Sequence, residues 1–152
     1  MSTSSNTVHL HRVFTAPPER VYKAFVDAKA LERWLPPYGF LGTIHEMYAR
    51  VGGGYRMSFT NFGAGSSHFF NVKFVELTPG ERIVHTDTFE DPNLPGEMTV
   101  TIDFKKVICG TELSIVQAGI PEAIPAEMCY LGWQESLMQL KQLVEPEIPD
   151  GQ

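Results

Sequence analysis

Apolar and polar residues alternate along much of the chain, and this alternation predicts a series of β-strands. The clearest case is residues 98–104, where Met, Val, Ile and Phe occupy every second position and polar residues lie between them. A period of two places successive side chains on opposite faces, so one face of the sheet is apolar and the other is exposed to solvent. The strands predicted in this way cover 8–14, 43–50, 54–62, 67–77, 82–89, 97–107 and 111–118.

Apolar spacings of three and four residues predict two short helices and one long helix. Pro18 suits the first turn of a helix over about 18–26, because the N–H that proline lacks would be unpaired there. Asp27 is placed to cap a second short helix, which ends before Pro36. Residues 126–144 carry an apolar stripe along one side and predict a long C-terminal helix.

Turns rich in glycine and proline separate the predicted strands and favour antiparallel pairing between neighbours. The Gly52-Gly53-Gly54 run predicts a tight turn or bulge that lets the next strand begin close to a neighbour. The sheet and the long helix each have an apolar face that needs a cover. The pattern therefore predicts an α+β fold, in which a curved antiparallel sheet of about six to seven strands wraps around the C-terminal helix and the short helices close one end. We expect one domain over 8–145, with flexible tails at 1–7 and 146–152.

Composition and charge narrow the classes of function. With 43% hydrophobic and 20% charged residues, the 152-residue chain has an ordinary globular balance, which excludes disorder as its main state. A formal net charge of −6 argues against nucleic acids and anionic membrane surfaces as partners. No signal peptide or membrane span is expected, so we expect a cytoplasmic protein. Cys109 and Cys129 lack Cys-x-x-Cys spacing, and we expect two buried free thiols.

Several stretches of the chain resemble one known family. They are Arg-Val-Phe-Thr-Ala-Pro-Pro-Glu-Arg-Val-Tyr-Lys-Ala-Phe at 12–25 with Leu-Glu-Arg-Trp-Leu-Pro at 31–36, Arg-Val-Gly-Gly-Gly-Tyr-Arg at 50–56, Phe-Val-Glu-Leu-Thr-Pro-Gly-Glu-Arg-Ile-Val at 74–84, and Gly-Trp-Gln-Glu-Ser-Leu-Met-Gln-Leu at 132–140. In this order they resemble the activator of heat-shock protein 90 ATPase homologue family, within the SRPBCC (START-like) superfamily. The resemblance covers about 8–145 and implies the helix-grip fold. It implies no single activity, because that superfamily includes lipid carriers, hormone receptors, polyketide cyclases and co-chaperone domains.

Motifs for cofactor chemistry are weak. The glycine run lacks the Lys-Ser/Thr of a phosphate-binding loop. His9 and His11 share a strand face, but no third metal ligand lies nearby in the sequence, and surface histidines are the favoured interpretation. No Gly-x-Ser-x-Gly elbow frames a serine. We therefore expect no metal and no cofactor.

A set of apolar and polar side chains is predicted to line a cavity between the sheet and the long helix. Its members are Trp34, Tyr55, Met57, Phe59, His85, Asp87, Met98, Val100, Gln117, Tyr130, Trp133 and Leu137. His85 and Asp87 share a strand face with Ile83 and Phe89, so two polar groups would interrupt an apolar wall. They could orient a ligand or act as acid and base, but a mutually hydrogen-bonded or solvent-facing pair is favoured.

The leading hypothesis from the sequence is a protein that binds a small apolar molecule in this cavity, with binding favoured over catalysis and the question of a reaction left open. The first alternative is a cyclase- or dehydratase-like enzyme that uses His85 and Asp87. The second alternative is a protein-interaction module that regulates a chaperone ATPase, which is disfavoured because the eukaryotic co-chaperones of the family carry a further N-terminal domain. In the Phe69-Phe70 pair one ring must point outward, which leaves a homodimer open.

Overall fold

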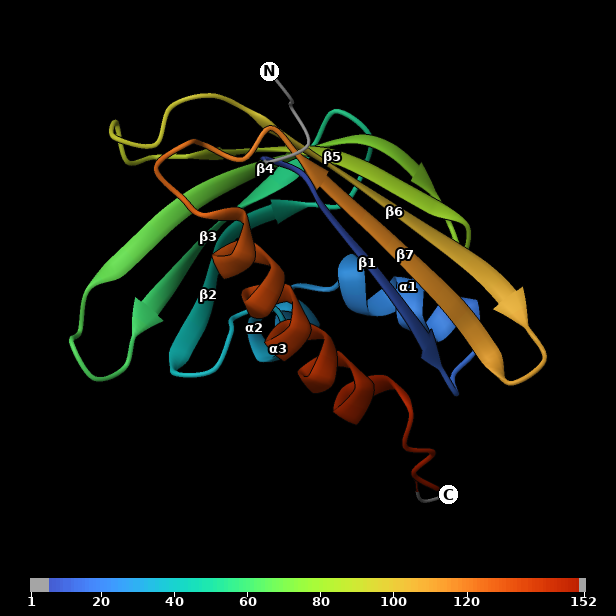
Figure 1. The fold of residues 1–152 in the computed structure, drawn as a ribbon. Coiled ribbons are helices and arrows are strands. Elements are labelled where there is room, and N and C mark those ends of the chain that lie inside the picture. Colours follow the sequence, from blue (N-terminus) through green and yellow to red (C-terminus); the bar gives the residue numbers. More distant parts are fainter. Residues whose placement is uncertain (1–5, 151–152) are drawn as a thin grey trace.

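The computed structural model describes residues 6–150, which form a seven-stranded antiparallel sheet curved around the last helix (Figure 1). The strands are β1 (Val8–Phe14), β2 (Phe40–Tyr48), β3 (Gly54–Asn61), β4 (Ser67–Thr78), β5 (Arg82–Phe89), β6 (Met98–Val107) and β7 (Gly110–Ala118). Their order in the sheet is β1-β7-β6-β5-β4-β3-β2, so only β1 pairs with a strand distant in sequence. The predicted α+β, helix-grip architecture is confirmed.

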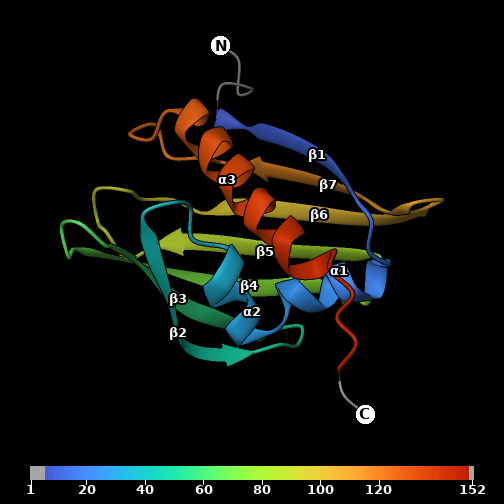
Figure 2. The same cartoon turned by 90° about the horizontal axis from the view of Figure 1, so that it is seen from below.

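Three helices occupy the concave side of the sheet. They are α1 (Pro18–Phe25), α2 (Ala28–Trp34) and α3 (Ala126–Val144). The side chain of Asp27 accepts a hydrogen bond of 3.0 Å from the Ala30 N–H, which is the cap predicted for the second helix. Helix α3 crosses the sheet obliquely, while α1 and α2 lie beside its C-terminal half (Figure 2). No helix within 6–150 is long and apolar enough to span a bilayer.

The interior beside α1 and α2 is filled by aromatic rings. Trp34 is fully buried, and its indole N–H donates to the Ala24 carbonyl at 2.8 Å. The Phe25 ring packs edge-on against Trp34 at 4.8 Å and against Phe104 at 5.4 Å. Such edge-to-face pairs stabilise beyond the area that they bury. The Trp34 ring is thus enclosed in the packed core, whereas Phe25 also borders a pocket.

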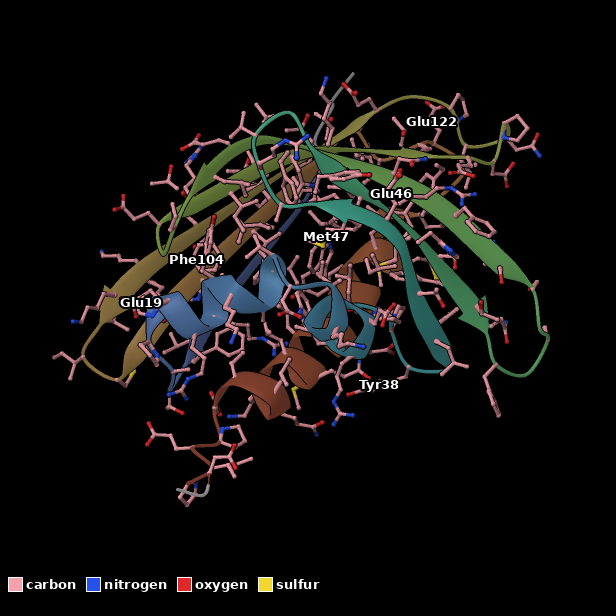
Figure 3. The ribbon with its side chains drawn as sticks, turned by 180° about the vertical axis from the view of Figure 1, so that it is seen from behind. Glu19, Tyr38, Glu46, Met47, Phe104 and Glu122 are labelled. Carbon is pink, nitrogen blue, oxygen red and sulfur yellow. The ribbon has the colours of Figure 1, made fainter. Side chains whose placement is uncertain are left out.

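Irregularities in β2 and β4 change which side chains face the interior. The pairing of β2 with β3 shifts register between Ile44 and Glu46. As a result Ile44 and Met47, three residues apart, both pack against the core, whereas Glu46 is exposed. Figure 3 shows Met47 directed inward and Glu46 on the outer side of the sheet. A comparable shift in β4 lies between Phe74 and Glu76. A bulge of this kind inserts one residue and reverses the faces beyond it.

On the convex face, Arg56 connects a group of polar and aromatic side chains. Its guanidinium lies 4.5 Å from the centre of the Phe69 ring and binds both carboxylate oxygens of Glu90, at 2.7 and 3.0 Å. The His45 ring also packs against Phe69, at 5.3 Å. Phe69 is the outward ring of the Phe69-Phe70 pair, as expected, but side chains of its own chain partly cover it. The observation that left a homodimer open is therefore weakened, and the oligomeric state stays a prediction.

Glu90 predicts a specific change in titration when Arg56 is replaced. Hydrogen bonds from Arg56 and then from Asn71 lower the pKa of Glu90 from 4.5 to about 2. Because this pKa is lowered on folding, the stabilisation is complete above pH 4.5 and is lost as pH falls toward 2. In Arg56→Met the Glu90 pKa should rise toward 4.5, as measured by carboxyl carbon NMR. Arg82→Met, whose partners are Glu76 and Asp103, is the control and should leave Glu90 unchanged.

Candidate functional site

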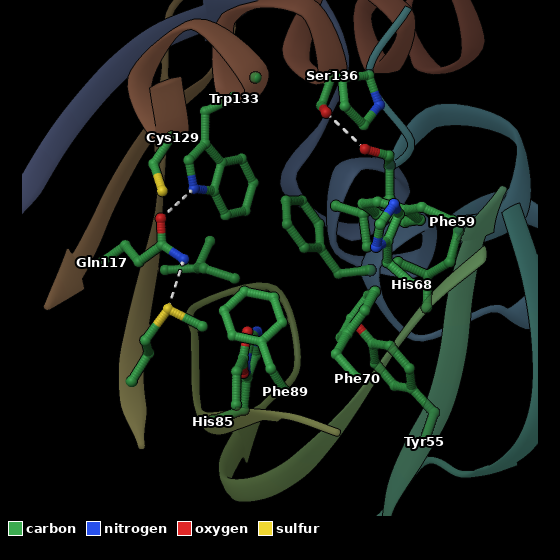
Figure 4. A pocket seen from close by; sticks show the side chains of 18 of the residues that line it. Tyr55, Phe59, His68, Phe70, His85, Phe89, Gln117, Cys129, Trp133 and Ser136 are labelled. Atoms are coloured by element: carbon green, nitrogen blue, oxygen red, sulfur yellow. Dashed lines mark hydrogen bonds and ion pairs between the residues drawn. The ribbon is translucent and has the colours of Figure 1, made fainter. Parts of the chain in front are cut away.

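A pocket of about 260 Å³ lies between the sheet and the N-terminal half of α3. Its floor comes from β3, β4, β5, β6 and β7, and its roof comes from α3 and from Leu35 and Pro37, which follow α2. Phe25 of α1 and Leu31 of α2 also border it. In Figure 4, Trp133 and Cys129 lie across an open space from Tyr55, Phe59 and Phe70. The lining is mostly apolar with a few polar groups, which is the usual composition of a small-molecule site.

The N-terminal half of α3 leaves this space open because it contributes few large side chains to the interior. The buried residues of α3 are Ser136, Leu137, Leu140 and Val144, all in its C-terminal half. Gly132 lines the pocket, and a Cβ placed there would meet no atom within 4 Å. The glycine at this position therefore adds free volume to the pocket.

Aromatic rings form the wall opposite the helix. Phe59 and Phe70 pack edge to face at 5.1 Å, and Tyr55 packs against Phe74 at 6.0 Å. Phe89 lies on β5 beside them and also faces the pocket. Rings from three adjacent strands give a broad apolar surface on which a flat molecule can lie.

His85 and Asp87 form a polar pair in this apolar wall. Both side chains are about nine-tenths buried, with 9% and 12% exposed, and His85 Nδ1 lies 2.5 Å from Asp87 Oδ1. The i, i+2 spacing on β5 places both on the same face of the strand, as the sequence predicted. Because the carboxylate can only accept, Nδ1–H is the donor in this contact.

Tyr55 stands near the same pair. Burial raises the pKa of its phenol strongly, and the charge of Asp87 raises it further. The hydroxyl group therefore stays protonated and keeps its capacity to donate a hydrogen bond.

Gln117 connects the roof of the pocket to its floor. The Trp133 indole N–H donates to Gln117 Oε1 at 2.9 Å, and Gln117 Nε2 donates to Met98 Sδ at 3.4 Å. Above them, Ser136 Oγ donates to the Leu35 carbonyl at 2.5 Å. The Trp133–Gln117 bond joins α3 to β7, and the Ser136 bond joins α3 to the end of α2, so the Gln117 amide acts as a tether between helix and sheet.

The structure brings together seven of the residues that the sequence proposed for the cavity. Those that line the pocket are Tyr55, Phe59, His85, Asp87, Met98, Gln117 and Trp133. Trp34, Met57, Val100 and Leu137 are fully buried in the packed core instead. Tyr130 is 41% exposed and lies outside the pocket. Whether the lining residues bind a ligand stays a prediction.

Tyr130 lies outside the pocket, contrary to the prediction, because α3 crosses the sheet at an angle. Its spacing of seven puts it in line with Leu137 and Val144, which are buried. Near its N-terminus, however, the helix turns a different stripe toward the pocket, which includes Cys129, Gly132 and Trp133. A straight stripe drawn through the whole helix therefore fails at this end.

Several pocket residues were not proposed from the sequence. Phe70 and Phe74 share one face of β4 with the buried Val72, and this period of two could have identified them. Leu35, Pro37 and Met128 lie in or near loops and reach the pocket only through tertiary packing.

The two cysteines differ in their surroundings. Cys129 lines the pocket, and burial raises the pKa of its thiol, which makes the thiolate scarce. Cys109 is exposed, which corrects the prediction that both thiols are buried. It belongs to the tight turn between β6 and β7, where there is no sheet face to cover it. Both cysteines are free. No cluster of three or more His, Cys, Asp or Glu side chains suited to a metal ion occurs in the described part of the chain.

Comparisons with known proteins place the chain in a family. The family described as "Activator of Hsp90 ATPase homolog 1-like protein" matches residues 15–145. A solved protein from Chromobacterium violaceum is 58% identical with a TM-score of 0.92, over 93% of this chain and 99% of that one. An AHSA1 protein from Silicibacter pomeroyi shares the fold at 19% identity with a TM-score of 0.77, over 90% and 96% of the two chains. No curated protein matches. The match over residues 15–145 shows that this chain belongs to the family of Activator of Hsp90 ATPase homolog 1-like proteins.

Proposed function

We propose that this protein binds a small, mostly apolar molecule in the pocket between the sheet and α3. The observation that carries the proposal is the pocket of about 260 Å³ itself, walled by Phe59, Phe70, Phe74 and Phe89 and roofed by Trp133. Burial of ligand surface on these rings stabilises a complex by about 25 cal/mol per Å² before the losses of association are subtracted. Few polar groups line the pocket, so they would set orientation and contribute little to the total affinity.

Gly132 offers a direct way to test the proposal. Calorimetry with naphthalene as the probe should detect binding to the wild-type chain. In Gly132→Phe the new ring would occupy the pocket. The affinity for naphthalene should fall by about tenfold or more, because the ring and naphthalene cannot fit in the same space without strain. The matched control is Met138→Phe, which adds the same ring to an exposed position on the same helix, 42% accessible in the native chain.

Naphthalene binding that is unchanged by Gly132→Phe, or absent from the wild-type chain, would contradict the proposal. Stability provides a check on folding, since Gly132→Ala should raise the free energy of unfolding by up to ~1 kcal/mol through helix propensity alone.

Native mass spectrometry of protein purified from its own host would identify a retained ligand, and conversion of that ligand on incubation would favour the enzymatic alternative.

A further inference from the structure

One nitrogen of His85 faces the pocket without a protein partner. Nδ1 is occupied by Asp87, at 2.5 Å, and no residue within 6–150 bonds to Nε2. Every fully enclosed side-chain nitrogen or oxygen in that range has a hydrogen-bond partner. Nε2 is therefore not sealed by protein atoms, and the space that it meets is the pocket lined by His85.

Asp87 determines what this nitrogen can do. A carboxylate can only accept hydrogen bonds, so Nδ1 carries the proton that it shares with Asp87. In the neutral imidazole the other nitrogen then has the lone pair, and Nε2 is a hydrogen-bond acceptor. If a ligand transfers a proton to Nε2, the adjacent carboxylate stabilises the resulting imidazolium.

The surroundings of Nε2 make an unpaired acceptor costly. The His85 side chain is 9% exposed, and its ring packs edge-on against Phe74 at 6.1 Å. A polar atom in such a place is stabilised when a ligand supplies the missing partner. The Gln117 amide is partly satisfied, since its oxygen accepts from Trp133 and its nitrogen donates to Met98, whereas Nε2 of His85 has no partner within 6–150.

We propose that the pocket selects flat aromatic molecules with a weakly acidic hydroxyl group, such as phenols and naphthols, whose O–H donates to Nε2 of His85. The rings of the wall receive the aromatic body, and the histidine receives the hydroxyl group. This inference rests on the proposed function, because it describes the chemistry of the ligand in the same pocket. Asp87 acts as a positioning residue that keeps the lone pair of His85 directed toward the ligand.

Naphthalene and two of its derivatives test this selectivity by calorimetry on the full chain. The probes are naphthalene, 2-naphthol and 2-methoxynaphthalene, in which the hydroxyl hydrogen is replaced by methyl. The wild-type chain should bind 2-naphthol about tenfold or more tightly than either of the other two, as expected for a hydrogen bond formed in a desolvated site. Equal affinity for all three would overturn the inference while leaving the proposed function intact.

Asp87→Asn separates a role in tautomer control from a role in packing. The amide that replaces the carboxylate can donate to Nδ1 or accept from it, so nitrogen NMR of the His85 ring is used to identify the nitrogen that carries the proton. Where Nε2 carries it, the preference for 2-naphthol should be lost, and 2-acetonaphthone, which carries an acceptor, should gain affinity relative to naphthalene; where Nδ1 keeps it, the preference should remain. A cooperative urea-unfolding transition shows that the variant folds. A preference for 2-naphthol that does not follow the protonated nitrogen in this way would overturn the inference, and failure of the wild-type chain to bind naphthalene would overturn the proposed function as well.

Discussion

Replacing Trp34 by alanine is expected to lower the free energy of unfolding by about 3–5 kcal/mol. The side chain is fully buried, packs against Phe25 at 4.8 Å and donates its N–H to the Ala24 carbonyl at 2.8 Å. Removing it deletes the contact of α2 with the end of α1 and leaves a cavity that the surrounding rings can only partly fill. Since domains of this size are stable by roughly 5–15 kcal/mol, the variant should unfold at a much lower urea concentration.

Two further substitutions show whether burial of Trp34 is the cause. Trp34→Phe keeps a ring in the site but removes the N–H donor, so its loss should be smaller than that of the alanine variant. Tyr38→Ala removes an aromatic ring that is 56% exposed just beyond α2, and it should change stability by less than about 0.5 kcal/mol. Equal losses for Trp34→Ala and Tyr38→Ala would contradict the assignment of Trp34 to the packed core.

Gly54→Ala is the second substitution expected to have a large effect, about 3 kcal/mol or more, because it places a methyl group against backbone atoms. A Cβ at Gly54 would lie 1.8 Å from the Val72 carbonyl oxygen and 3.0 Å from the Lys73 Cα. Both atoms belong to β4, the partner of β3, so relief requires the two strands to separate at this end. Urea unfolding should show a lower midpoint, and amide hydrogen exchange should be faster at the start of β3.

Gly63→Ala is the matched control for Gly54→Ala. Gly63 lies in the turn after β3, and a Cβ there would meet Asn61 Oδ1 at 3.7 Å, which is an ordinary contact. Its effect on stability should be within about 0.5 kcal/mol. If the two alanine variants prove equally stable, the close approach of β3 to β4 at Gly54 is wrong.

The behaviour of Gly54 illustrates how far the sequence predicted the fold. The triple glycine indicated a turn that lets the following strand begin close to a neighbour, and the distance to Val72 confirms that interpretation. The strands, the cap at Asp27 and the position of the long helix were also predicted, because each depends on residues close in sequence. Strand ends were less accurate: β2 begins at Phe40, three residues before the predicted start.

The candidate site was predicted where the strand period is regular. His85 and Asp87 lie on one face of β5, as their spacing indicated, and Tyr55 and Phe59 do so on β3. The prediction failed for Trp34 and Leu137, which are as apolar as the pocket residues but are enclosed by other side chains. The sequence contains no local signal that separates a residue packed against a ring from one that borders an empty space.

By itself, the sequence determined the elements and their apolar faces, because periodicity and turn chemistry act over a few residues. Only the tertiary structure decided where the pocket lies. The oblique path of α3 turns Cys129 and Gly132 toward the sheet and leaves Tyr130 outside, and the ring of Trp34 fills the space beside α1 and α2. The physical reason is that a cavity is the volume left after all the elements have packed, and packing depends on helix angles, bulges and contacts between residues far apart in the chain.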